Sequence, residues 1–400
     1  MNRHFLIFLD KSIFQIIFYF ILLLAKLRKR NKPDYYPQLK GTEGFLVIRP
    51  GGLGDAIMSI PLLKALRKRF PQSRISLLCV KKNKGALQHL PYFDQLVVID
   101  SLCRLHKNLS IVLRGQYDVV IDLEPFRKIS SIVAYLFGTN IRIGFDTNNR
   151  RLLYTHYVTY ANEKCYESLN MLRQLSVLGL KVSDKEAVDM SFPLPDDLLE
   201  NTRSMLRSYG LKPDEDFVIA LAPGVLKAHH RWSMEKFSSV IRLIQQEDDS
   251  AKILLVGAPT DIADAQEVLE HLRNRKPVIN LVGKTSFVEV LAILKNCRIL
   301  IACDGGIVYV GAAMGCGTIS IWGPGVMDRF KPPGKNHLGV RKDYFCVPCV
   351  NYSRFGEFPG CPYDRKCIND ISALDVFEKY VALKTRILDK GNEGPSREGM

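Results

Sequence analysis

One stretch of the chain joins a carboxylate to a glycine-rich turn. Residues 45–48 are short and apolar, as expected of a buried strand, and the residues that follow include Gly51, Gly52, Gly54 and Asp55. Strand, glycine turn and helix in this order direct backbone N–H groups and a helix N-terminus toward an anion such as phosphate. A carboxylate repels phosphate, so Asp55 is either a helix cap or a catalytic base. Pro61 is expected to interrupt or kink a helix that starts at Asp55, which would leave Asp55 on a loop, not needed as a cap, and favour the catalytic role.

A second candidate site is a basic loop near the middle of the chain. The expected strand 217–222 is followed by four side chains that can carry positive charge, Lys227, His229, His230 and Arg231. They stand just before a helix that Ser233 is expected to cap. Cations beside free helix N–H groups suit a diphosphate, and a solvated basic loop is the alternative.

Two further loops add to this candidate site. Asp304, Gly305 and Gly306 precede an expected helix over 307–314, which repeats the layout around Asp55. The loop containing Lys284 and Thr285 leads into another helix. There the spacing of Ser286 and Glu289 predicts a capping box.

These sites need parallel strands to position them. Short apolar segments alternate with helical patterns, and this alternation predicts doubly wound parallel sheets. The expected strands are 45–48, 74–80, 96–99, 119–123, 141–145, 217–222, 252–256, 299–303 and 318–322, with 318–322 expected to be the last. Asp55, Asp122 and Glu124 fall at carboxyl ends of strands, where ligands bind in such sheets. For Asp122 and Glu124, a structural role as helix-capping loop residues is equally open.

Taken together and in order, the motifs resemble those of the heptosyltransferase family, glycosyltransferase family 9. The matching residues are Arg49-x4-Gly54-Asp55 with Pro61, Pro223-Gly224 with Arg231-Trp232, Leu281-x-Gly-Lys-Thr285, Asp304-x-Gly306 and Gly323-Pro324. The resemblance implies a GT-B fold of two facing Rossmann-like domains. It also implies inverting transfer of a sugar, heptose from ADP-heptose in the best-known members, to lipopolysaccharide. No catalytic metal is then expected.

The same resemblance implies roles for individual residues. Asp55 matches the acidic residue thought to be the general base. The implied donor-binding residues are Lys227, His230, Arg231, Lys284, Thr285, Asp304, Gly305 and Gly306. Gly51, Gly52 and Gly54 would let the sugars approach the backbone. The family usually has Lys at position 230, His at 309 and Ser or Thr at 305, so the departures His230, Tyr309 and Gly305 bear on the identity of the donor.

The ten cysteines divide into two groups. Six are scattered, most of them within apolar runs, and are expected to be buried thiols of a reducing compartment: Cys79, Cys103, Cys165, Cys297, Cys303 and Cys316. The other four have the spacing C-x2-C-x11-C-x5-C and predict a structural zinc or iron site: Cys346, Cys349, Cys361 and Cys367. Reduced or disulfide-paired cysteines without metal are the alternative.

The N-terminal segment predicts a membrane anchor. Residues 5–25 are almost wholly apolar and are followed by five basic residues within 26–32. The positive-inside rule places this flank, and the catalytic body, at the cytoplasmic face of the inner membrane. The segment would either span the bilayer or lie in its plane, and a helix packed on the protein core is the alternative.

The overall charge indicates anionic partners. The net charge is +15 and the pI about 9.3. Without a nucleic-acid-binding motif, we expect an anionic membrane surface, a nucleotide-sugar donor and a lipid-linked glycan acceptor, and no nucleic acid. A sugar-nucleotide epimerase and a non-catalytic nucleotide-sugar-binding scaffold are the alternatives.

The expected domain organisation follows from these patterns. An anchor and basic linker (1–40) precede an acceptor domain (41–190) and a nucleotide-sugar domain (191–345). A Cys-rich loop (346–370), a C-terminal helix (371–390) and a disordered tail (391–400) complete the chain. The helix either crosses back to the first domain or packs on its own.

Overall fold

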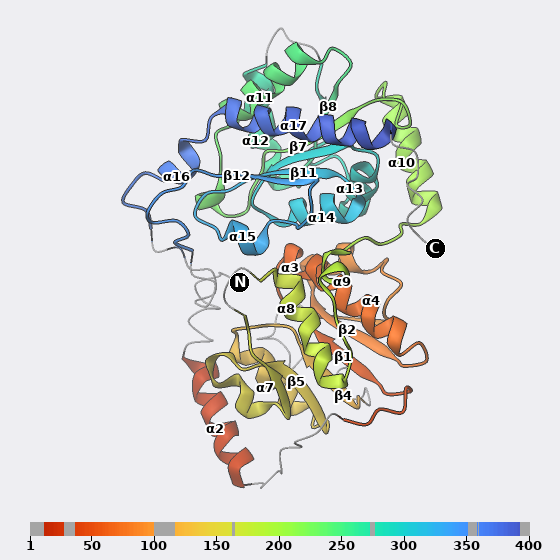
Figure 1. Ribbon diagram of the computed structural model, residues 1–400, viewed down its shortest axis with the longest axis vertical. Coiled ribbons are helices and arrows are strands. Elements are labelled where there is room, and N and C mark those ends of the chain that lie inside the picture. Colours follow the sequence, from red (N-terminus) through yellow and green to blue (C-terminus); the bar gives the residue numbers. More distant parts are fainter. Residues whose placement is uncertain are drawn as a thin grey trace. The chain divides into compact units, whose positions relative to one another are not determined.

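The computed structural model describes residues 12–27, 37–99, 117–161, 165–272, 277–350, 358 and 360–392. The chain divides into two compact units, with the division between Met190 and Ser191, and the described residues beyond Val350 belong to the second unit. Each unit is a parallel sheet with helices packed against it (Figure 1). The prediction of two doubly wound α/β domains is confirmed.

The first unit is built on a six-stranded sheet in the order β3-β2-β1-β4-β5-β6. All neighbouring strands pair in parallel. The strands are β1 (Phe45–Ile48), β2 (Ile75–Val80), β3 (Gln95–Ile99), β4 (Val119–Asp122), β5 (Ile141–Phe145) and β6 (His156–Val158). β1 and β4 are fully buried, which explains their continuous apolar sequences.

Helices surround this sheet. Pro61 was expected to interrupt the helix after Asp55, and α3 indeed ends at Met58 before α4 starts at Ile60, with Pro61 in its first turn. The helices are α2 (Ile13–Leu27), α3 (Leu53–Met58), α4 (Ile60–Arg69), α5 (Lys84–Leu87), α7 (Lys128–Leu136), α8 (Glu167–Arg173) and α9 (Asp184–Val188), and the 3-10 turns are η1 (Lys81–Asn83), η3 (Thr147–Leu153) and η4 (Gln174–Leu178).

The second unit repeats the topology, with the strand order β12-β11-β10-β7-β8-β9. Its strands are β7 (Val218–Ala222), β8 (Lys252–Leu255), β9 (Ile279–Asn280), β10 (Ile299–Cys303), β11 (Gly317–Ile321) and β12 (His337–Val340). Its helices are α10 (Asp196–Ser208), α11 (Met234–Glu247), α12 (Ile262–Glu270), α13 (Phe287–Lys295), α14 (Gly306–Met314), α15 (Met327–Phe330), α16 (Lys366–Asn369) and α17 (Ala373–Asn392), with 3-10 turns η5 (Ala228–His230) and η6 (Pro259–Asp261).

The three strands missing from the sequence prediction are the short outer strands β6, β9 and β12. They have two to four residues and are only partly buried, so they lack a long apolar run. The segment expected to be the last strand is therefore followed by β12. Both predicted caps are confirmed: Ser233 accepts the Lys236 N–H, and Ser286 forms a capping box with Glu289.

The C-terminal helix α17 packs on its own unit. Val376, Tyr380 and Leu383 are fully buried and belong to the same core cluster as Trp232 and Phe237 of the second unit. The expected tail beyond residue 392 lies outside the described residues.

The N-terminal prediction needs a correction. The helix α2 has 15 residues, and within the described part of the chain no helix is long and apolar enough to cross a membrane. A spanning anchor is therefore not supported. Residues 1–11 and 28–36, which complete the predicted anchor and most of its basic flank, lie outside the described residues.

Candidate functional site

Both sheets have a topological switch point, which is the place between two neighbouring strands whose following connections run to opposite sides of the sheet. It lies between β1 and β4 in the first unit and between β7 and β10 in the second. Ligands of doubly wound sheets bind outside the carboxyl ends of the strands at this point. Asp55 follows β1, whereas the His230 loop and Asp304 follow β7 and β10.

Asp55 lies in the first turn of α3. Its Oδ2 accepts the Gly52 N–H at 2.6 Å, and its Oδ1 lies 2.9 Å from Arg49 Nη2. The prediction that Asp55 stands on a loop and need not act as a cap is therefore wrong. The side chain is nevertheless 35% exposed, so a ligand can reach it. A Cβ at Gly51 would lie 2.4 Å from Asp55 Oδ2, which explains the glycine at position 51.

Arg49 positions the Asp55 carboxylate, a role that the sequence alone did not reveal. Arg49 is 2% exposed, and its Nη1 donates to the Leu123 carbonyl oxygen at 2.9 Å. Burial alone would lower the pKa of Arg49, but the negative charges of Asp55, Glu124 and Glu167 raise it above its ordinary value. The guanidinium therefore stays charged and ties Asp55 to the loop after β4. The sequence feature that could have indicated this role is an arginine that directly follows a wholly apolar strand.

Asp122 and Glu124 have structural roles. Asp122 is fully buried, and its Oδ2 accepts hydrogen bonds from Arg150 Nη2 at 2.6 Å and from Tyr154 Oη at 2.7 Å. Glu124 accepts the Phe126 N–H at 3.2 Å. These contacts consolidate the loop after β4 and favour a structural role over a ligand-binding one, although neither carboxylate caps the following helix α7.

In the second unit, the fold brings His230 and Asp304 together although they are far apart in the sequence. His230 Nδ1 lies 2.9 Å from Asp304 Oδ2. The imidazole is 1% exposed, and neither ring nitrogen has a hydrogen bond of good geometry to any described residue. Asp304 lies so close to Gly325 that a Cβ at position 325 would be only 2.7 Å from Asp304 Oδ2. The pair is thus a tightly packed polar centre at the switch point.

The other predicted cations are more exposed. Arg231 forms an ion pair with Asp264 and is 41% exposed. Asp264 lies in the first turn of α12 and was not part of the predicted site. Lys227 is partly buried at the start of the same loop, one residue before η5.

The loops after β7, β8 and β9 touch one another. A Cβ at Gly224 would lie 2.2 Å from Asp261 Cγ, and the Gly283 N–H donates to the Gly257 carbonyl oxygen at 3.1 Å. This contact places the segment with Lys284 and Thr285 beside the loop after β8. Lys284 is exposed, whereas Thr285 Oγ1 is buried and has no hydrogen-bond partner among the described residues.

Gly305 and Gly306 form the start of α14. Gly305 is its N-cap in an extended conformation, and Gly306 is its first residue. The nearest atom to a Cβ at Gly305 would be 3.6 Å away, so this position has room for the Ser or Thr that is common in the family. A helix N-terminus of this kind can present N–H groups to an anion, although the Val308 N–H already donates to the Gly305 carbonyl oxygen at 3.2 Å.

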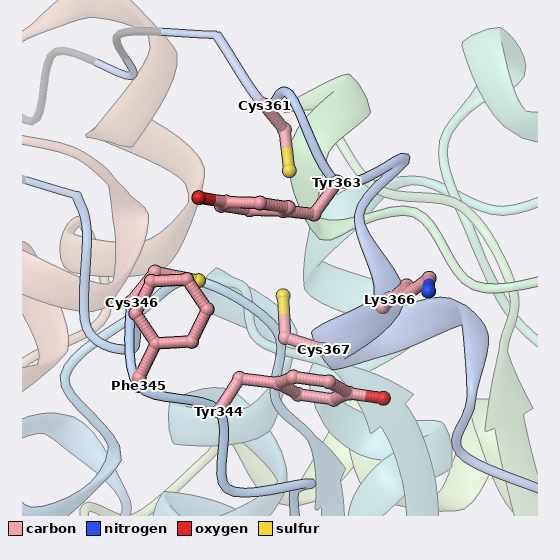
Figure 2. Close-up of a pocket in the computed structure, with 7 residues that line it drawn as sticks. All are labelled: Tyr344, Phe345, Cys346, Cys361, Tyr363, Lys366 and Cys367. Atoms are coloured by element: carbon pink, nitrogen blue, oxygen red, sulfur yellow. The ribbon is translucent and has the colours of Figure 1, made fainter.

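The four clustered cysteines lie in the second unit. Three of them, Cys346, Cys361 and Cys367, line a cavity of about 150 Å³ together with Tyr344 and Tyr363. In Figure 2 the sulfur atoms of Cys361 and Cys367 point toward the space between them. Burial, and then the neighbouring thiols, raise the pKa of Cys367 to about 11.

This arrangement does not support the predicted zinc or iron. Within the described ranges, no three His, Cys, Asp or Glu side chains are placed to hold a metal ion. Of the six scattered cysteines, Cys79, Cys297, Cys303 and Cys316 are buried free thiols as predicted, Cys165 is partly buried, and Cys103 lies outside the described residues.

Comparison with known proteins agrees with this architecture. The family model described as glycosyltransferase family 9 (heptosyltransferase) matches residues 104–357. Lipopolysaccharide heptosyltransferase 3 of Escherichia coli is 23% identical over 285 residues, which cover 68% of this chain and 80% of that protein. Two solved structures share the fold. A glycosyl transferase family 9 protein of Veillonella parvula has a TM-score of 0.75 and 23% identity (88% of this chain, 99% of the other). E. coli ADP-heptose lps heptosyltransferase II has a TM-score of 0.68 and 20% identity, and the match covers 87% of this chain and 99% of that one.

Proposed function

Because the chain belongs to glycosyltransferase family 9, we propose that this glycosyltransferase moves heptose from ADP-heptose to a lipopolysaccharide-type, lipid-linked acceptor with inversion. The names of the relatives support this choice of donor and acceptor. The family match does not favour a sugar-nucleotide epimerase or a non-catalytic scaffold.

Asp55 is the proposed general base for the acceptor hydroxyl. The observation that carries this role is the pairing of a partly exposed carboxylate with a buried cation at the carboxyl end of β1. Arg49 stabilises the ionised carboxylate and fixes its orientation, and a base must be ionised to accept a proton. Of the neighbouring glycines, Gly52 is partly exposed and is proposed to admit a sugar ring beside the backbone, whereas Gly51 and Gly54 are buried and Gly51 faces the Asp55 side chain.

The second unit is proposed to bind the donor. The first turn of α14, Gly305 and Gly306 included, offers N–H groups to the diphosphate, and Lys227 and Arg231 add positive charge for the departing nucleotide. Asp304, which is 11% exposed beside the buried His230, is suited to accept hydrogen bonds from sugar hydroxyls. Lys284 and Thr285 are proposed to contact the nucleotide.

An acceptor-dependence assay tests the proposal. The purified full chain is incubated with ADP-heptose or a UDP-sugar, with and without lipopolysaccharide that lacks heptose. ADP release and the mass of the acceptor are then measured. We expect release from ADP-heptose only when the acceptor is present, and an acceptor heavier by one heptose. Isomerisation of the sugar nucleotide without acceptor would contradict the proposal.

The role of Asp55 has its own test. Asp55→Ala should lower kcat by about 100-fold or more while the affinity for ADP is retained, because a general base acts on the chemical step. Asp189→Asn is the matched control, since Asp189 is an exposed carboxylate of the same unit that pairs with Lys64. If Asp55→Ala lowered the affinity for ADP by as large a factor as it lowers kcat, Asp55 would have a structural role.

A further inference from the structure

The helix α2 is attached to the first unit through one of its faces. Phe18 is fully buried and Leu22 is 7% exposed, and both pack against Ile132 of α7 and Leu153 of η3. Figure 1 shows α2 lying beside α7 at the edge of this unit. The helix is therefore held by the fold along this face.

The opposite face of α2 is apolar and open. Ile16, Tyr19, Phe20 and Leu23 are 71%, 47%, 60% and 59% exposed, respectively. Their spacing of i, i+3, i+4 and i+7 places them along one side of the helix. A continuous apolar stripe of this kind marks an interaction surface, whereas single exposed apolar residues do not.

The charges around this stripe are positive. None of the residues of α2, α7 and η3 is acidic. Lys128 Nζ lies 5.2 Å from the ring centroids of both Phe18 and Tyr19, and Arg151 of η3 is exposed. An apolar stripe flanked by cations is the pattern of a helix that lies at the interface of an anionic membrane.

We infer that α2 docks the enzyme on an anionic lipid surface, with its axis in the membrane plane and Ile16, Tyr19, Phe20 and Leu23 inserted among the lipids. A second copy of the chain fits this surface less well, because a symmetric contact would bring Lys128 and Arg151 toward the same charges of the partner. Anionic headgroups neutralise these charges, and acyl chains take up the stripe.

The consequence for catalysis rests on the proposed function. A lipid-linked acceptor is confined to the membrane surface, so an enzyme held there meets it at a higher effective concentration. Docking through α2 should therefore increase transfer to acceptor in vesicles and leave transfer to a water-soluble acceptor unchanged.

Vesicle co-sedimentation of the full chain tests the docking. The double variant Ile16→Gln/Phe20→Gln removes two exposed apolar side chains but keeps the buried contacts of Phe18 and Leu22. We expect it to bind phosphatidylglycerol-containing vesicles about 10- to 100-fold more weakly than the unmodified chain. Leu374→Gln/Leu388→Gln, at exposed positions of α17 in the second unit, is the matched control and should bind normally.

Unchanged vesicle binding by the α2 variant would overturn the inference. So would equal binding of the unmodified chain to neutral phosphatidylcholine vesicles. If the unmodified chain is a dimer and the α2 variant is a monomer that still binds vesicles, the stripe is a contact between copies of the chain and the inference is also overturned. Transfer to a delipidated, water-soluble core oligosaccharide separates the two proposals. If the α2 variant keeps this activity but loses activity on vesicle-bound acceptor, docking is supported. If the unmodified chain transfers to neither acceptor, the proposed function fails while the vesicle result stands.

Discussion

Removing the Asp122 carboxylate should selectively destabilise the first unit. Asp122 and Arg150 are both fully buried, and their closest polar atoms lie 2.6 Å apart. Two guanidinium nitrogens of Arg150, Nε and Nη1, have no hydrogen-bond partner among the described residues. Asp122→Ala therefore leaves a buried cation without its carboxylate. Breaking such a pair costs about 3–5 kcal/mol, a large part of the roughly 5–15 kcal/mol that keeps a domain folded.

The distribution of tryptophan makes the effect measurable unit by unit. The chain has two tryptophans, Trp232 and Trp322, and both are buried in the second unit. In urea titrations, tryptophan fluorescence therefore follows the second unit, whereas far-UV circular dichroism follows both. With m of about 2 kcal/mol/M, Asp122→Ala should lower the midpoint of the first-unit transition by roughly 1.5–2.5 M, with the fluorescence midpoint unchanged.

A double variant tests the electrostatic reason. Asp122→Leu with Arg150→Met removes both charges, and its cost should be clearly smaller than that of Asp122→Ala alone, because no uncompensated charge remains. If the double variant is the less stable of the two, packing and not charge governs this site. Equal shifts of the fluorescence and dichroism transitions in Asp122→Ala would refute the assignment of the effect to the first unit.

Two further predictions concern the second unit. Burial and the nearby Lys331 lower the pKa of His337 from 6.5 to about 4, so the folded state favours neutral imidazole. Unfolding then takes up a proton as the pH falls from 6.5 toward 4. Over this range the unmodified chain should lose about 3 kcal/mol more of its free energy of unfolding than the His337→Gln variant. The free energy is measured by tryptophan fluorescence in urea. Parallel profiles of stability against pH for the two proteins would contradict this prediction. Gly325→Ala should weaken ADP-heptose binding by about tenfold in calorimetry, since its Cβ would lie 2.7 Å from Asp304 Oδ2, and unchanged affinity would argue against a donor role for Asp304.

The inner strands of both sheets could be predicted from the sequence because strands buried on both faces need continuous apolar residues. β1 and β10, which are wholly apolar, match the expected ranges residue for residue. The outer strands β9 and β12 could not be found, since partly buried edges accept polar residues and are specified mainly by pairing with their neighbours.

The candidate site shows the same division. Local chemistry was enough to select Asp55, the basic loop and Asp304, because a carboxylate or a cation next to glycines at the end of a strand has few structural uses. Asp122 also falls at the carboxyl end of a strand, and the sequence left open whether it binds a ligand or has a structural role. The tertiary structure separates them by burial, since Asp122 is enclosed with Arg150 whereas Asp55 remains partly exposed.

What the sequence by itself determined is the succession of strands, turns and helices, the reactive residue types at strand ends, and an apolar N-terminal segment followed by positive charge. Only the tertiary structure decided the partners: Arg49 for Asp55, Asp304 for His230, and Asp264 for Arg231. It also decided which face of α2 is buried and which is open. The physical reason is that periodicity and propensity act over a few neighbouring residues, whereas ion pairs and burial depend on side chains that the sheet topology brings together from distant positions.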